Sequence, residues 1–481
     1  MDKQSVPTDA EGLAGSGSST AIAQAVCEAE QCLQCEDPVC VGGCPLAVPI
    51  PDFMNAIALG DMQGAARILR SANPLPAICG RICEQEEHCE SSCHLSKRLM
   101  PVSIGHLFRF VADWERGQPA SRATSKPWRS RRVAVIGSGT AGLVCAGELA
   151  RLGYPVTVYE GLHEPGGLLR YGIPEQNFPK EILDWEIDLL KRHGVEIICN
   201  VIVGQDMKME DLIDKMGFSA VFIATATGRP HYLGIPGENL NGVFSAKEFL
   251  TRINLRQSSA YSEDDAPMQG KRVAVIGADQ TAMEVIRSAL RMGAEEGHVI
   301  YQRSEKEMPA SSEEYRHACE EGVKFHWLTS PIEILGDEDG WIDGLRCIRT
   351  EPGEPDASGK AKLIPVEDSE YVLSTNSIVL SFERTDNPLQ VNAGSDLEAK
   401  MKGDHIVEKG KDTASQAGLG GAVDAATGTD SVITAAGAGK NGAAAIHKEL
   451  CRDDDWLEVQ RSKGWDDFME WCQQMENGPH E

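Results

Sequence analysis

Eight cysteines in two quartets are the residues of this chain best suited to metal or redox chemistry. The first quartet has the spacing C-x2-C-x4-C-x3-C and is followed by Pro45, and the second has the spacing C-x3-C-x5-C-x3-C. Their members are Cys32, Cys35, Cys40 and Cys44, and then Cys79, Cys83, Cys89 and Cys93. The total of 15 cysteines is odd and strongly clustered, in a large chain with no recognisable export signal. This usage favours metal ligation over disulfides.

The cysteine spacing fits iron–sulfur clusters better than a zinc site. In a run like the first quartet, three cysteines hold one [4Fe–4S] cluster and the fourth serves another. Structural zinc usually pairs C-x2-C elements around one tetrahedral ion, and the x4 and x5 gaps suit that arrangement less well. We therefore predict two [4Fe–4S] clusters, with zinc or unligated thiols as the alternatives. Helical apolar patterns at 50–71 and 103–114 predict a small α-helical domain around the clusters.

A glycine-rich turn at 137–142 indicates a dinucleotide site. It follows an apolar run, opens a helical pattern that continues to about residue 152, and is followed by a second apolar run that ends on an acid. In this motif the three glycines allow the tight turn, the approach of a pyrophosphate and close helix–strand packing, and the acid accepts from a ribose hydroxyl. The predicted site comprises Gly137, Ser138, Gly139, Ala141, Gly142 and Glu160.

The strand–turn–helix pattern recurs at 271–294, which predicts a second nucleotide-binding domain. Gly277 opens its turn, and the next strand ends on Gln302 and Arg303, which suit the 2′-phosphate of NADP better than the free ribose of NAD. Asp279 stands at the close-approach position. A carboxylate about 4 Å from a pyrophosphate charge would cost about 4 kcal/mol at a surface-like dielectric. Either Asp279 turns outward, or NADPH binds weakly, or the domain serves packing alone.

Composition limits the possible partners and compartments. The 481 residues carry 46 Lys and Arg against 73 Asp and Glu, a net charge of −27, which argues against nucleic acid and anionic membranes as partners. No apolar run approaches the roughly 18 residues of a membrane span. Residues 1–24 read as a disordered leader and 451–481 as an acidic tail. We predict a soluble, cytoplasmic protein.

Four further stretches carry a family resemblance: CLQCEDPVCVGGCP, NPLPAICGRICEQEEHCE, IGHLFRFVADWE and EPGGLLRYGIPE. With the first glycine-rich turn they resemble the family of the NADPH-dependent glutamate synthase small subunit. That family includes the large subunit of ferredoxin–NADP transhydrogenases and the N-terminal part of dihydropyrimidine dehydrogenase. The resemblance covers roughly residues 27–450. It implies FAD on the first turn, NADPH on the second, and a large catalytic or electron-accepting partner subunit in a hetero-oligomer.

The fold class expected is α/β, with two Rossmann-like nucleotide-binding domains, one inserted in the other, preceded by an α-helical double [4Fe–4S] domain. The predicted parts are a leader at 1–24, the iron–sulfur domain at 25–117, a linker at 118–130, the first part of the FAD domain at 131–244, the NAD(P)H domain at 245–375, the second part of the FAD domain at 376–450 and the tail at 451–481. A Gly/Pro/Asp-rich excursion at 351–370 predicts a surface hairpin.

The resemblance also implies how the ligands are distributed. One cluster would take Cys32, Cys35, Cys40 and Cys93, and the other Cys44, Cys83 and Cys89. The family's fourth ligand of the second cluster, Gln or Glu, is replaced by Phe108, which cannot bind iron. Either Cys79 or one of Glu84, Glu86 and Glu87 substitutes, or the cluster is three-iron, labile or missing.

For the flavin, the resemblance places Gly166 and Gly167 against the cofactor and Asp424 at its ribityl–phosphate region. Further departures from the family pattern occur at 226–227, 381–383 and 422–423. We predict a subunit that passes electrons from NADPH through FAD to the clusters and a partner, and hydride transfer requires no catalytic side chain. The alternative is a degenerate assembly or electron-wire subunit in which NADPH binding, and in part cluster or FAD binding, is weakened or lost.

Overall fold

The structure is a computed structural model that describes residues 19–97, 100–118, 127–175, 177–225, 233–258, 268, 270–355, 361–381, 400–402, 405–407, 419–421 and 431–451. The chain forms two compact units, and the second is inserted in the first, as expected. The first comprises Met1–Leu169, Phe178–Thr227 and Asn387–Glu481, and the second comprises Arg170–Asn177 and Gly228–Asp386. None of the described helices is long and apolar enough to cross a membrane.

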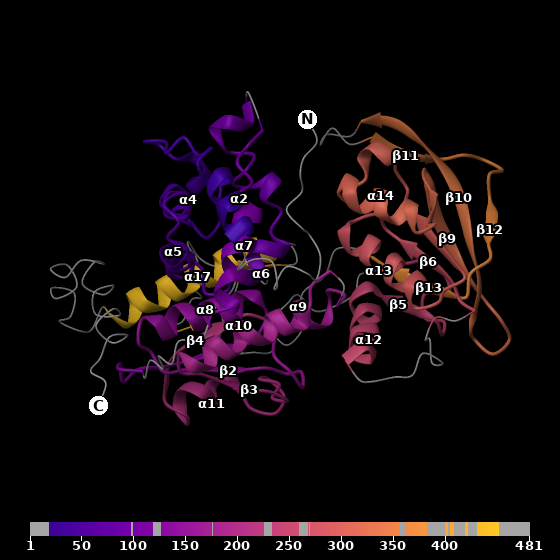
Figure 1. Ribbon diagram of the computed structural model, residues 1–481. Helices are drawn as coiled ribbons and strands as arrows, with labels where there is room; N and C mark the ends of the chain where they lie inside the picture. Colours follow the sequence, from indigo (N-terminus) through magenta and orange to yellow (C-terminus); the bar gives the residue numbers. More distant parts are fainter. Residues whose placement is uncertain are drawn as a thin grey trace. The chain divides into compact units, whose positions relative to one another are not determined.

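The first unit begins with a helical domain (Figure 1). Its helices are α2 (Ser19–Ala29), α3 (Val39–Gly42), α4 (Ile50–Ala58), α5 (Met62–Ala72), α6 (Pro76–Ile82) and α7 (Ile104–Arg116), with short 3-10 turns η1 (Gln85–Glu87) and η2 (His94–Lys97). Because α2 begins at Ser19, the predicted leader boundary at residue 24 is wrong. The helical stretch expected at 50–71 is two helices, since Gly60 takes a φ of +76° and Asp61 caps α5 by accepting from the Gly64 N–H at 2.8 Å.

The first nucleotide-binding domain follows in the same unit. Five parallel strands run in the order β16-β4-β1-β2-β3: β1 (Arg132–Ile136), β2 (Val156–Tyr159), β3 (Val195–Ile198), β4 (Phe218–Ile223) and β16 (Leu419–Gly421). Helices α8 (Thr140–Arg151), α10 (Lys180–Arg192) and α17 (Val432–Leu450) cover one face, and α11 (Met209–Asp214) covers the other (Figure 1). With both faces covered, β1 is buried after its first residue and β2 is buried along its whole length, as is usual for parallel strands.

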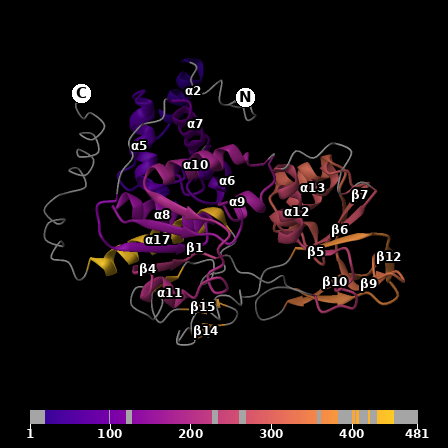
Figure 2. The same ribbon diagram turned by 90° about the horizontal axis from the view of Figure 1, so that it is seen from below.

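Three short elements complete the first unit. The helix α9 (Leu168–Tyr171) begins in this unit and ends in the second, and β14 (Lys400–Lys402) pairs antiparallel with β15 (His405–Val407) (Figure 2).

The second unit repeats this architecture. Its parallel sheet has the order β5-β13-β6-β7-β8: β5 (Val243–Ser245), β6 (Arg272–Ile276), β7 (Glu296–Ile300), β8 (Lys324–His326) and β13 (Ser377–Leu380). Its helices are α12 (Ala246–Ser258), α13 (Gln280–Arg291) and α14 (Ser312–Glu320), with the 3-10 turn η4 (Glu305–Glu307). Since β5 and β13 belong to this sheet, the boundaries predicted at 244 and 375 are wrong, and the inserted domain is longer at both ends.

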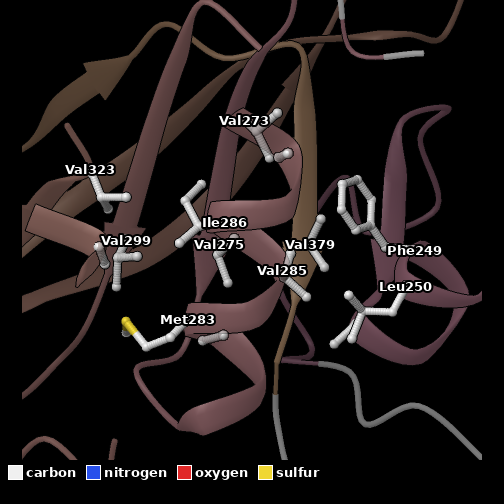
Figure 3. Close-up of a cluster of buried hydrophobic side chains, with 14 of the residues drawn as sticks. Phe249, Leu250, Val273, Val275, Met283, Val285, Ile286, Val299, Val323 and Val379 are labelled. Carbon is white, nitrogen blue, oxygen red and sulfur yellow. The ribbon is translucent and has the colours of Figure 1, made fainter. Parts of the chain in front are cut away.

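An antiparallel sheet completes the second unit. It comprises β9 (Thr329–Gly336), β10 (Ile342–Pro355), β11 (Ala361–Pro365) and β12 (Tyr371–Leu373), and the pairing of β10 with β11 confirms the hairpin predicted at 351–370. Apolar side chains of β9 and β10 pack against one face of the parallel sheet. On the other face, Met283 and Ile286 of α13 meet Val275 and Val299 of the strands, and Phe249 of α12 closes the core (Figure 3).

Candidate cofactor sites

The first group of thiols lies in the helical domain and lines one cavity. Cys32 and Cys35 follow α2, Cys40 lies in α3 and Cys93 precedes η2, so three segments bring the four thiols together. The other lining residues are mostly apolar. Burial, helped by the neighbouring Cys93 and Cys32 thiols, raises the pKa of the Cys40 thiol to about 11. Free thiolates are therefore unfavourable here, whereas iron binds thiols in the deprotonated form.

The second group lines a separate cavity. Its thiols are Cys44, Cys79, Cys83 and Cys89, and the remaining lining includes Asn73, Gln85, His88, Phe108 and Ile433. Burial raises the pKa of both the Cys83 and Cys89 thiols, and the charge of Cys44 adds to the effect. Throughout the described residues, no three His, Cys, Asp or Glu side chains converge closely enough to hold a single metal ion. The thiols of each group instead surround a cavity.

The structure sorts the thiols as the family resemblance implies. Cys44 belongs to the first quartet but lines the second cavity, and Cys93 belongs to the second quartet but lines the first cavity. Of the proposed substitute ligands, the three glutamates at 84, 86 and 87 are exposed and do not line the cavity, whereas Cys79 does. Sequence reasoning missed Asn73 and Gln85, since an amide has no characteristic spacing that marks it as a lining residue. The residues present thus suit two clusters.

The first glycine-rich turn has the geometry of a phosphate site. Gly137 takes a φ of +98°, and a Cβ at Gly142 would lie 2.0 Å from the Gly137 carbonyl oxygen, so both positions require glycine. Gly139 is the N-cap of α8, and glycine has no side chain to cap the helix. A Cβ at Gly139 would lie 4.0 Å from its nearest neighbour beyond the adjoining residues, the Ala224 carbonyl oxygen, so the space above this residue is open. Uncapped N–H groups at a helix N-terminus bind phosphates.

Glu160 is fixed beside this turn by three hydrogen bonds. One carboxylate oxygen, Oε2, accepts from the Ser138 N–H at 2.8 Å and from the Ser138 hydroxyl at 2.5 Å, and Oε1 accepts from the Leu162 N–H at 2.9 Å. A carboxylate has about four acceptor positions. Among the described residues, these bonds leave one position on Oε1, which suits the ribose hydroxyl that sequence analysis predicts.

The loop at 166–167 closes against the same turn. The Gly166 N–H donates to the Ser138 hydroxyl at 2.9 Å, and a Cβ at Gly167 would lie 2.9 Å from the Gly139 Cα. Ala141 is buried in the first turn of α8. The structure therefore gathers all the predicted flavin residues that it describes, and Asp424 lies outside the described residues.

The second glycine-rich turn differs from the first at the N-cap. Gly277 makes the same turn, with a φ of +128°. Asp279, however, caps α13: its Oδ1 accepts from the Ala282 N–H at 2.7 Å and from the Ser381 hydroxyl at 2.7 Å. Of the alternatives that the sequence left open, an outward-turned Asp279 is therefore wrong. Its carboxylate occupies the position at the helix N-terminus that a pyrophosphate would use.

The predicted 2′-phosphate residues lie at the end of β7. The Gly277 N–H donates to the Ile300 carbonyl at 3.0 Å, which brings the turn beside this strand end. Gln302 is exposed, and Arg303 forms an ion pair with Glu307 at 3.2 Å. The residues after β7 thus fit the 2′-phosphate of NADP, but the Arg303 guanidinium is paired with the Glu307 carboxylate.

We expect Glu307→Gln to raise the affinity for NADPH roughly two- to fivefold, the usual scale of an exposed ion pair. The glutamine keeps the capping bonds to Ser304 but releases Arg303 for a phosphate. Titration with NADPH, with NADH as the control ligand, measures the change. An equal gain for NADH, which lacks the 2′-phosphate, would contradict the role of Arg303.

Comparisons with known proteins agree with this arrangement. Residues 15–120 match the family described as dihydropyrimidine dehydrogenase domain II, 4Fe-4S cluster, and residues 131–364 match the family described as pyridine nucleotide-disulphide oxidoreductase. The chain is 34% identical over 451 residues to the glutamate synthase [NADPH] small chain of Escherichia coli (strain K12), covering 91% of this chain and 92% of that protein. The chain belongs to the glutamate synthase small-chain family.

Two further similarities support this family membership and the fold. The NADPH-Fe(3+) oxidoreductase subunit beta of Geobacter sulfurreducens (strain DL-1 / KN400) is 38% identical over 71% of this chain and 50% of its own length. The structure of Mycobacterium tuberculosis FprA in complex with NADPH has the same fold, with a TM-score of 0.56 at 18% identity over 72% of this chain and 90% of that one. The chain is thus an FAD-dependent NAD(P)H oxidoreductase with a [4Fe–4S] domain, and the predicted family and fold class are confirmed.

Proposed function

We propose that this glutamate synthase small-chain relative passes electrons from NADPH through FAD to two [4Fe–4S] clusters, and from them to a larger partner subunit. Bound nicotinamide and flavin supply the hydride and single-electron chemistry. The chain supplies the uncapped N-terminus of α8 and the Glu160 acceptor for FAD, and two cavities with four thiols each for the clusters.

The observation that carries this proposal is the position of α17. Ile433 of this helix lines the second thiol cavity, and a Cβ at Gly439 would lie 2.2 Å from the Ala141 carbonyl oxygen in the first turn of α8. The Lys440 ammonium donates to the Leu46 carbonyl at 2.5 Å and to the Ala72 carbonyl at 2.9 Å. One helix therefore contacts the cysteine domain and the phosphate turn, which supports electron transfer between a flavin and the second cluster.

Anaerobic titration of the full chain with NADPH tests the proposal. The flavin absorbance is expected to bleach, and signals of reduced clusters are expected to follow, with ferricyanide as the acceptor for turnover. If dithionite reduces the flavin and NADPH does not, electron entry from NADPH is excluded.

The names of two relatives as subunits support a partner protein for this chain. Two are named as a small chain and a subunit beta. We infer that this chain also acts in a hetero-oligomer, in which the partner accepts electrons from a cluster. Co-purification of the tagged full chain from its own cells, followed by identification of any stoichiometric protein, tests this inference; a chain that purifies alone and reduces its physiological acceptor unaided would contradict it.

A second candidate is an electron-wire or assembly subunit that receives its electrons from a partner. The bond between Ser381 and Asp279 favours it, because it holds a carboxylate at the predicted pyrophosphate position. Under this candidate the chain binds FAD and clusters but NADPH fails to reduce the flavin, so the titration above separates the two.

A further inference from the structure

The second thiol cavity contains one more cysteine than the ligand set that the family resemblance implies. Cys44, Cys83 and Cys89 are joined there by Cys79, which lies in α6 and is 4% exposed. Phe108 lines the same cavity from α7, and its ring packs edge-on against Phe53 with 4.9 Å between centroids. An aromatic ring therefore stands where a fourth ligand would otherwise come from α7.

The fold brings Cys79 to this cavity through close packing of α6 on α7. A Cβ at Gly80 would lie 2.7 Å from the Arg109 backbone nitrogen, so the two helices touch next to Cys79 and Phe108. Asn73 is 1% exposed and fixes the start of this segment, since its side-chain oxygen accepts from the Leu75 N–H at 2.8 Å. The segment that carries Cys79 is thus held by helix packing at Gly80 and by the Asn73 side chain before α6.

Other lining groups are weaker candidates for iron. Gln85 and His88 line the cavity, but the Gln85 amide nitrogen lies 3.5 Å from the Cys79 carbonyl oxygen, and both residues belong to the segment around η1. Thiolate is the usual ligand of a [4Fe–4S] cluster. Cys79 supplies a buried thiol beside the three other thiols of this cavity.

We propose that Cys79 is the fourth ligand of the second cluster, so that four thiolates hold it: Cys44, Cys79, Cys83 and Cys89. The inference rests on the proposed iron–sulfur function of the chain. A thiolate in place of a neutral amide ligand adds one negative charge, and net charge is one of the factors that set the reduction potential. This cluster is then harder to reduce than one with a glutamine ligand.

Cys79→Ala tests the assignment in the anaerobically purified full chain. The wild type is expected to hold about eight iron atoms, and the variant about four if the cluster is lost or seven if it becomes three-iron. A three-iron cluster would give an electron paramagnetic resonance signal before reduction. Cys27→Ala is the control, because Cys27 is exposed and lies outside both cavities. Unchanged iron, sulfide and spectra in Cys79→Ala would overturn the proposal.

A second variant keeps the test decisive if Cys79→Ala does not fold. Phe108→Gln restores the family's ligand type and leaves Cys79 in place. With Cys79 as ligand, the iron content and resonance signals of Phe108→Gln are expected to match those of the wild type. A wild type that carries a three-iron cluster, which Phe108→Gln completes, would refute the role of Cys79. A wild type without any iron or sulfide would instead refute the proposed function itself.

Discussion

Asp279→Gly is expected to raise the affinity for NADPH by about a thousandfold. The Asp279 carboxylate accepts from the Ala282 N–H at the start of α13, where the pyrophosphate of a dinucleotide would bind. Two negative charges about 4 Å apart repel by about 4 kcal/mol at a surface-like dielectric, and each 1.4 kcal/mol is a factor of ten. Fluorescence or calorimetric titration of the full chain with NADPH measures the gain.

Two companion variants separate charge from shape at this turn. Asp279→Asn keeps a capping side chain without the charge, so most of the gain is expected there as well, with little loss of helix stability. Ser381→Ala removes the hydroxyl that holds the carboxylate and leaves the charge, so only a small gain is expected. As the control ligand, 2′-AMP carries the 2′-phosphate without either phosphate of the pyrophosphate and should bind the variants nearly alike. Equal NADPH affinity in wild type, glycine and asparagine variants would contradict this account.

The sequence alone could not predict the hydrogen bond between Asp279 and Ser381, because the two residues lie far apart along the chain. Asp279 is visible in the sequence as a departure from the glycine motif, but its partner Ser381 follows β13, in a segment read from the sequence as a separate departure. Only the pairing of β13 with β6 puts the hydroxyl and the carboxylate side by side. Two changes that look independent in sequence are one interaction in the fold.

The two thiol cavities also show what sequence spacing can and cannot predict. Spacing predicts iron–sulfur ligation and a second cluster for the fourth cysteine of the first quartet, Cys44. It does not say that Cys93 joins the first three cysteines, because that depends on how the segment before η2 packs. The family resemblance supplied the grouping of the cysteines. The structure then excluded the three glutamates as the fourth ligand in place of Phe108, because they are exposed and do not line the cavity. Local motifs thus identify the ligand types, and tertiary packing selects among them.

Domain boundaries were predictable only to within one strand. The apolar run Ser377–Leu380 reads equally well as a strand of either nucleotide-binding domain, because both sheets are parallel and covered on both faces. Similarly, α2 starts in a stretch of Ser, Thr and Ala that composition assigns to a leader. Strand partners and helix packing are not encoded in local composition.

Glu160→Ala is expected to yield protein without FAD and with markedly lower stability. The substitution leaves the Ser138 N–H, the Ser138 hydroxyl and the Leu162 N–H without their acceptor beside the phosphate turn. Glu160 is 7% exposed, so water does not readily replace it. Each of the two buried Ser138 donors left unpaired costs about 1–3 kcal/mol, which predicts a loss of about 2–6 kcal/mol if the structure does not relax.

Flavin content and urea unfolding of the full chain measure the two effects, and the reconstitution of apoprotein with added FAD separates them. Asp188→Ala is the control, because Asp188 forms an exposed ion pair with Lys191 on α10 and should cost no more than about 1 kcal/mol. Glu160→Gln is the finer probe: the amide can accept from Ser138 with its oxygen, but its NH2 group then faces the Leu162 N–H. The glutamine variant should therefore fold and bind FAD less tightly than wild type. Full FAD occupancy in Glu160→Ala would show that the carboxylate is not a ribose acceptor and that the turn alone holds the nucleotide.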